Sequence, residues 1–136
     1  GTTENNNLSN VLQDILDTPV SPELLPPKDG VISQKTENLV GPYELHDFYM
    51  YYVLRYGFSP EKILLLADNS SLPYSHELKL HWLRNFYTRF FAQQFKRSCM
   101  PDGVKVGTVG LSPRGDWKMP SDSSCAVWLE QIDKLK

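Results

Sequence analysis

Apolar residues recur every three or four positions along much of the chain, and this spacing predicts amphipathic helices. The pattern covers residues 8–16, 43–56, 59–67, 75–95 and 121–135. Gly57 follows the second segment as a helix-ending glycine would, and the third opens with Ser59, a proline and a glutamate, which is a helix-start signal. Segment 75–95 has two apolar faces, so we expect a central helix packed on more than one side.

The segments between these helices differ in character. Residues 1–7 carry no apolar periodicity, and we expect them to be disordered. Residues 28–42 are polar, bounded by glycines and poorly periodic, which predicts a long mobile loop that could act as a lid. Residues 98–119 contain four glycines and two prolines around a short β-prone stretch, so an ordered loop is favoured there over a pair of strands.

Size and composition indicate a single soluble domain, and the helical spacing described above predicts that it is of the mostly α class. The chain has 136 residues, of which 40% are hydrophobic and 22% charged. It contains no run of 18 apolar residues, and its N-terminus has neither the basic start nor the apolar stretch of a signal peptide. We therefore expect a cytoplasmic protein with no membrane partner.

Charge is distributed unevenly along the chain. The net charge is −2, which argues against a polybasic nucleic-acid binder, yet residues 84–118 hold seven basic side chains against two acidic ones. This basic segment predicts a local site for an anion. Its aromatic residues fall at the spacing of a helix core, so RNA binding through stacked bases is the weaker hypothesis.

Motifs of self-contained catalysis are missing. The three histidines do not have the spacing of a zinc-binding helix, and there is no cysteine cluster, nucleophile elbow or phosphate-binding glycine loop. We assign no catalytic residue and no metal ligand. His46 is expected to be a half-buried histidine that is hydrogen-bonded beside aromatic rings.

Basic and hydroxyl residues supply the candidate binding positions. Lys96, Arg97 and Ser98 stand where the long helix should end, and the two cations could either complement the helix dipole or reach a nucleotide phosphate. The hydroxyl of Ser21 could cap a short helix or receive a phosphate oxygen. Arg114 belongs to SPRGDW, whose ordinary interpretation is a turn held by an aspartate-to-backbone bond.

Four motifs in order give the chain a resemblance that periodicity alone does not supply. They are TPVSPELLPP, ISQKTENLVGPYELHDFYMYYVLRYGFSPEKI, FYTRFFAQQFKRSCMPDGVKVG and LSPRGDWKMPSD. Together they resemble the C-terminal end of the glutamine-dependent NAD+ synthetases, over roughly residues 8–136. The resemblance implies that residues 1–136 are the C-terminal part of a synthetase domain.

The family resemblance implies a particular chemistry. In that family a nitrilase-like glutaminase domain of the same chain releases ammonia. A synthetase domain of the α/β adenine-nucleotide α-hydrolase-like class adenylates deamido-NAD+ with ATP and Mg2+, and ammonia then displaces AMP. This chain contains neither the glutaminase domain nor the SGGxDS-type pyrophosphate loop. We therefore expect a helical fragment that is inactive alone, binds no cofactor by itself and self-associates through apolar surface that the missing sheet would cover.

The resemblance also implies roles for individual residues. Lys96 corresponds to the lysine that contacts deamido-NAD+, and Ser21 to a hydroxyl residue near the ATP phosphates. Gln34 and Glu37 fall in the loop that closes over the nucleotide. For Arg97, Ser98 and Arg114, charge and loop position alone suggest nucleotide contacts. The alternative to a synthetase fragment is a helical protein-interaction module without catalysis.

Overall fold

The computed structural model describes residues 2–18 and 40–136, and these belong to two units that divide between Leu39 and Val40. The lid predicted over residues 28–42 and the short helix expected at Ser21 fall almost entirely outside the described residues. In the part of the chain that is described there are helices and no strand, so the structure confirms the mostly α class.

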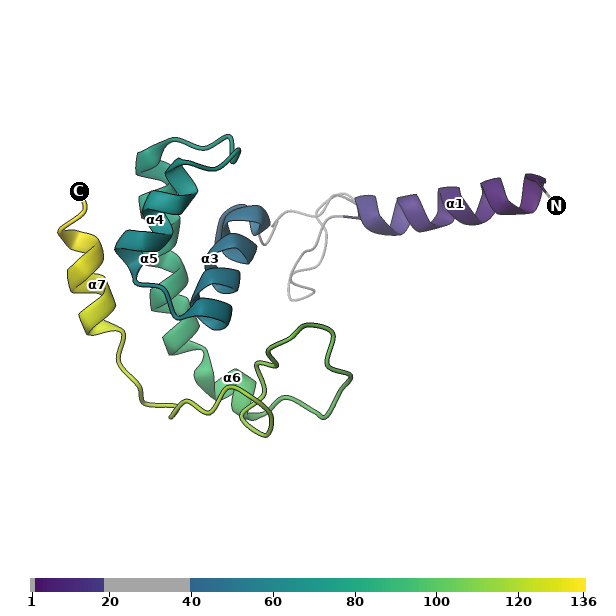
Figure 1. The fold of residues 1–136 in the computed structure, drawn as a ribbon. Helices are drawn as coiled ribbons and strands as arrows, with labels where there is room; N and C mark the ends of the chain where they lie inside the picture. Colours follow the sequence, from purple (N-terminus) through teal and green to yellow (C-terminus); the bar gives the residue numbers. More distant parts are fainter. Residues whose placement is uncertain (1, 19–39) are drawn as a thin grey trace, which may run out of the picture. The chain divides into compact units, whose positions relative to one another are not determined.

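The first unit contributes the helix α1, Thr2–Asp17 (Figure 1). The expected helix over residues 8–16 is present, but the expectation that residues 1–7 are disordered is wrong for residues 2–7, which are helical. Once a helical turn exists, each added residue gains a hydrogen bond at little further cost, and this outweighs the poor propensity of threonine and asparagine. One face of α1 is apolar, and its members are 51–77% exposed: Leu8, Val11, Leu12, Ile15 and Leu16.

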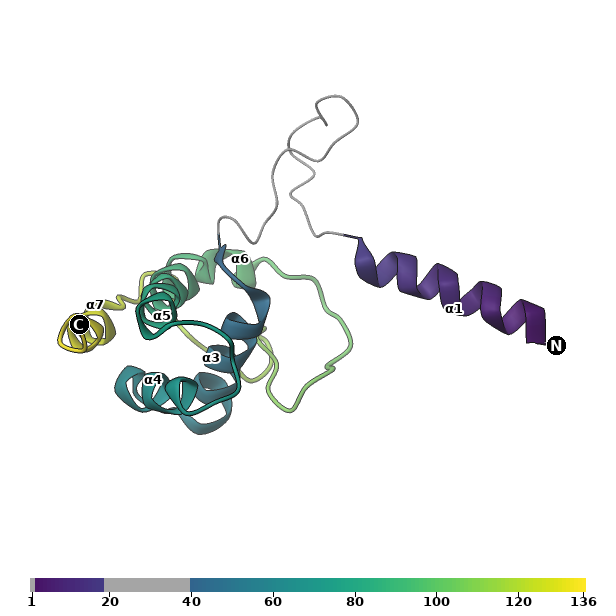
Figure 2. The same cartoon turned by 90° about the horizontal axis from the view of Figure 1, so that it is seen from above.

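Five helices form the second unit, residues 40–136. They are α3 (Tyr43–Tyr56), α4 (Pro60–Asp68), α5 (His76–Ala92), α6 (Gln94–Ser98) and α7 (Ala126–Asp133). In Figures 1 and 2, α3, α4 and α7 surround α5, which confirms the prediction of a central helix. None of the helices in the described part of the chain is long and apolar enough to cross a membrane.

Local sequence signals set the ends of these helices. Gly57 ends α3 in the left-handed conformation with φ 63°, as predicted. The Ser59 hydroxyl accepts a bond from the Lys62 amide, and Ser75 caps α5 in the same way through the Leu78 amide. The last helix begins at Ala126, five residues later than expected. Its N-cap residue is Cys125, which makes no side-chain capping bond, and the Ser124 hydroxyl accepts a bond from the Ala126 amide in the turn that precedes the helix.

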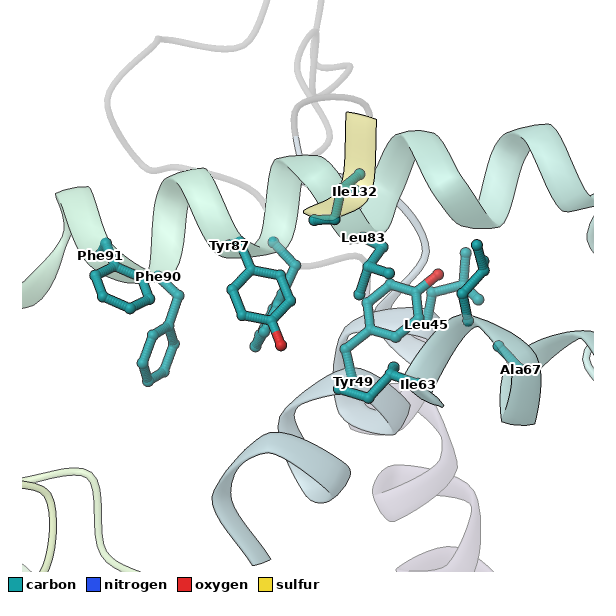
Figure 3. Close-up of a cluster of buried hydrophobic side chains, with 11 residues drawn as sticks. Leu45, Tyr49, Ile63, Ala67, Leu83, Tyr87, Phe90, Phe91 and Ile132 are labelled. Atoms are coloured by element: carbon teal, nitrogen blue, oxygen red, sulfur yellow. The ribbon is translucent and has the colours of Figure 1, made fainter. Parts of the chain in front are cut away.

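The core of the second unit lies along α5 (Figure 3). Tyr49 of α3 is fully buried, and its hydroxyl donates to the Lys79 carbonyl oxygen at 2.8 Å. The Lys79 ammonium is itself buried, where it donates to the Ala67 carbonyl oxygen at 2.9 Å at the end of α4. The apolar members of the core come from four helices: Leu45, Tyr49, Ile63, Leu64, Ala67, Leu83, Phe86, Tyr87, Phe90, Phe91 and Ile132.

His46 has the environment that the sequence predicts. It is half-buried beside the rings of Tyr49, Trp82 and Phe86, and its Nε2 is hydrogen-bonded to the Val40 carbonyl oxygen. Burial lowers the pKa of His46 from its ordinary value, because the charged imidazolium would lose solvation there, and the positive charge of Arg89 adds to this effect.

The lowered pKa of His46 makes the stability of the second unit pH-dependent. The folded state binds this proton less readily than the unfolded state, so the stabilisation is complete above the ordinary histidine pKa of about 6.5 and is lost as the pH falls below it. We expect urea titrations to show that the free energy of unfolding decreases as the pH is lowered below about 6.5. The variant His46→Gln removes the titrating group, and a pH dependence as steep as that of the wild type would contradict the assignment.

Candidate functional site: the α6 turn and its loop

The two candidate cations, Lys96 and Arg97, lie together on a short helix that follows α5. Helix α5 stops at Ala92, where the Gln93 amide donates to the Arg89 carbonyl oxygen, and a new short helix, α6, begins at Gln94. The sequence predicts one helix to about residue 95, so the break at Gln93 is a difference from that expectation. Lys96 and Arg97 are consecutive residues of α6, and consecutive side chains of a helix point in different directions, so the two have different surroundings.

Gln94 holds this turn in place. Its side chain is fully buried, and its Nε2 donates to the Met119 carbonyl oxygen at 2.8 Å, across 25 residues of sequence. Its Oε1 accepts a bond from Arg97 Nε at 2.8 Å, and its carbonyl oxygen accepts one from the Ser98 hydroxyl at 3.2 Å. Sequence reasoning missed Gln94. The available signal is its position four residues after Phe90, which places an amide on the core face of the helical pattern, where it must find partners.

Arg97 turns back onto the helix that precedes it. Its guanidinium lies 4.1 Å from the centre of the Phe90 ring, and the guanidinium NH2 donates to the Phe90 carbonyl oxygen. Burial lowers the pKa of Arg97 from its ordinary value, although a guanidinium remains charged in proteins. In this structure Arg97 therefore stabilises the turn. Ser98 is also engaged, since its hydroxyl lies 3.4 Å from that of Ser121.

Lys96 differs from its neighbour. It lies on the exposed side of α6, and its ammonium has no hydrogen bond or ion pair to any residue that the structure describes. An exposed, unpaired ammonium on a braced backbone can meet an anionic ligand without first breaking a bond within the protein. Of the two cations in this turn, Lys96 is the one available for binding.

Two ion pairs, each joined by a hydrogen bond to the backbone, bridge parts of the loop that follows α6. Arg114 Nε pairs with Asp102 Oδ1 at 2.9 Å, and its NH2 group donates to the Met100 carbonyl oxygen. Asp116 Oδ2 pairs with Lys105 Nζ at 2.6 Å and accepts a bond from the Gly110 amide at 2.7 Å. These bonds lower the pKa of Asp116, the one from Lys105 most. SPRGDW contains a turn as expected, but the Gly115 amide and the Ser112 carbonyl oxygen close it, while Asp116 bonds to the Gly110 backbone before the motif. The Arg114 guanidinium serves the loop itself.

The three remaining candidate positions, Ser21, Gln34 and Glu37, lie outside the described residues. Both cysteines are described and have free thiols, Cys99 exposed and Cys125 half-buried. Within the described ranges no group of three or more histidine, cysteine, aspartate or glutamate side chains could hold a metal ion.

Comparison with known proteins gives a consistent set of relatives. The glutamine-dependent NAD(+) synthetase of Mycobacterium leprae is 43% identical to this chain over 91% of its length. The glutamine-dependent NAD(+) synthetases of Mycobacterium bovis and Mycobacterium tuberculosis are 46% identical to it, also over 91% of this chain. The chain spans 21% of each of these relatives, about a fifth. No family model matches the chain, and no solved structure matches it. The chain is thus homologous to one part of the glutamine-dependent NAD(+) synthetases.

Proposed function

We propose that this chain serves as the C-terminal part of the synthetase domain of a glutamine-dependent NAD+ synthetase, where Lys96 binds deamido-NAD+. The observation that carries this proposal is the identity of 43–46% to such enzymes over 91% of the chain. The unpaired ammonium of Lys96 on the braced α6 turn supports the choice of residue. The remaining four-fifths of the enzyme supply the glutaminase domain and the ATP site.

The chemistry proposed for the whole enzyme places an anionic substrate beside this turn. The carboxylate of deamido-NAD+ attacks the α-phosphate of Mg2+-bound ATP to form an adenylate with release of pyrophosphate, and ammonia then displaces AMP to give the amide of NAD+. The pyrophosphate and carboxylate of deamido-NAD+ are anionic, so a cation held beside them orients the substrate and offsets its charge. Lys96 supplies that cation, while Gln94 and Arg97 fix the backbone from which it projects.

Partners follow from the same proposal. The glutaminase domain of the same polypeptide, a second copy of the enzyme, ATP and deamido-NAD+ complete the assembly in the cytoplasm. Ser21, Gln34 and Glu37 remain proposed contacts to the nucleotide. The 136-residue chain alone forms no NAD+ from deamido-NAD+, ATP and ammonia, and detection of NAD+ in that reaction would contradict this part of the proposal.

Replacing Lys96 tests the substrate contact in the intact enzyme. A hydrogen bond to a charged group contributes about 1.5–3 kcal/mol, so Lys96→Ala is expected to raise the KM for deamido-NAD+ about tenfold to hundredfold. The KM for ATP should change little. Steady-state kinetics with ammonia as the nitrogen source measure both values without involving the glutaminase reaction.

A matched lysine on the same unit serves as the control. Lys134 is exposed and pairs only with Glu130, at 2.8 Å, among the described residues. Lys134→Ala should leave both KM values unchanged. An unchanged KM for deamido-NAD+ in Lys96→Ala, or an equal rise in both variants, would reject Lys96 as a substrate contact.

A further inference from the structure

An aromatic pocket of about 450 Å³ lies in the second unit, apart from the Lys96 side chain. It opens between the C-terminal end of α3, the second half of α5 and the segment from Trp117 to Trp128. Its volume falls in the range of about 300–1,000 Å³ that is usual for small-molecule sites. The aromatic residues that line it are Phe58, Tyr87, Phe90, Phe91, Trp117 and Trp128.

Ring-to-ring contacts hold the walls of this pocket. Trp128 stacks on Tyr87 with 6.2 Å between ring centres and an interplanar angle of 16°. Trp117 meets Phe90 edge-on, with 5.6 Å between centres and an angle of 76°. Flat faces fixed in this way accept a flat ligand at low entropic cost, because few side chains must be ordered on binding.

Two polar groups of the pocket residues are buried without a hydrogen-bond partner among the described residues. Tyr87 is 2% exposed, and its hydroxyl has no partner in residues 2–18 or 40–136. The Trp117 indole Nε1 is likewise buried and unpaired within these ranges. In Figure 3 the rings of Tyr87 and Phe90 project from the same side of α5, with the Tyr87 hydroxyl at the end remote from the helix. An unmade bond of this kind costs free energy that a ligand acceptor would recover.

The lack of charged side chains in the pocket limits the kind of ligand that it can bind. None of the described residues that line it is an aspartate, glutamate, lysine, arginine or histidine. Burial raises the pKa of Tyr87 above its usual range, so the hydroxyl keeps its proton at neutral pH and can donate it to an acceptor. A charged ligand would lose its hydration here without gaining a counter-ion, whereas a neutral ring would not.

We propose that this pocket binds a neutral, flat heteroaromatic ring, whose nitrogen or carbonyl oxygen accepts a hydrogen bond from the Tyr87 hydroxyl. The proposal rests on the pocket, its fixed aromatic walls and the buried unpaired hydroxyl, and it stands independently of the role given to Lys96.

Two bicyclic probes of nearly equal shape test the proposal. Quinoline carries one acceptor nitrogen, and naphthalene carries none. The indole N–H signals of the three tryptophans, assigned by single Trp→Phe variants, report binding to the 136-residue chain in proton–nitrogen correlation spectra. We expect quinoline to shift the Trp117 and Trp128 signals saturably, with the Trp82 signal unchanged, and to bind more tightly than naphthalene.

The variant Tyr87→Phe keeps the ring and removes the hydroxyl. A lost neutral hydrogen bond is expected to weaken quinoline binding about fivefold, with naphthalene binding unchanged. Tyr51→Phe, on an exposed tyrosine outside this pocket, should change neither affinity. The wild-type comparison of the two probes does not depend on the folding of any variant. No saturable shift with quinoline, equal affinity for the two probes, or an equal loss of both in Tyr87→Phe would overturn the proposal.

Discussion

Replacing Gly41 with alanine is expected to lower the free energy of unfolding of the second unit by about 2–5 kcal/mol, from steric overlap and backbone strain together. Gly41 has φ 91°, a conformation that side-chain-bearing residues rarely adopt. A Cβ atom there would overlap Trp82 Cδ2 and would lie 2.6 Å from Cε3 of the same ring. The indole is a rigid plate that packs against His46 and His81, so it has no flexible end to move aside.

A second left-handed glycine isolates the contribution of the Trp82 contact. Gly57 has φ 63°, and a Cβ atom there would meet nothing within 4 Å. Gly57→Ala therefore carries only the cost of the left-handed backbone, about 1–2 kcal/mol. Urea unfolding followed by circular dichroism measures both variants. Equal losses at the two positions would show that the Trp82 contact does not constrain Gly41.

A second large decrease in the free energy of unfolding is expected when Gln94 is replaced. The variant Gln94→Met keeps nearly the same volume but removes the bonds to the Met119 carbonyl oxygen and to Arg97 Nε, and so leaves two polar groups without their partner. The expected loss is about 2 kcal/mol, because a polar group left unsatisfied costs about 1–3 kcal/mol when it is fully buried and these two bonds are only part-buried. Amide hydrogen exchange near residue 119 should also become faster.

The neighbouring glutamine provides the control for Gln94. Gln93 has a side-chain carbonyl oxygen that is buried and has no hydrogen-bond partner in the part of the chain that the structure describes. Gln93→Met therefore removes no bond of that oxygen and should leave the free energy of unfolding almost unchanged. If urea titrations found similar losses in the two variants, Gln94 would not be the residue that holds α6 to the loop.

Local signals predicted the helices better than the site. Residues 43–56 form α3 with the expected bounds, because the apolar spacing and Gly57 agree on where it lies and ends. The prediction of disorder is wrong for residues 2–7. These residues lack apolar spacing, yet they form the first turns of the helix whose apolar spacing begins at Leu8. A missing pattern therefore did not imply missing structure.

The site depends on contacts between distant parts of the sequence. Gln93 and Gln94 are identical in type, and only the partner of Gln94 at Met119, 25 residues away, distinguishes the two. Lys96 and Arg97 likewise form one basic pair in the sequence. Arg97 stands seven residues after Phe90, which is the sequence spacing of two helical turns, and this spacing is the signal that could have assigned it to stacking even though a break at Gln93 separates the two helices. Nothing near Gly41 indicates that Trp82 lies against it.

The two ion pairs of the loop after α6 have a consequence for protein engineering. Arg114 with Asp102, and Lys105 with Asp116, join the ends of a segment whose valines Val104 and Val106 are 92% and 97% exposed. Doubling the length of a flexible loop costs only about 0.6 kcal/mol of closure entropy when its ends stay fixed. Gly107 is therefore a suitable position for inserting an epitope or a fluorescent reporter, because the added residues leave the tethered ends and the helical core in place.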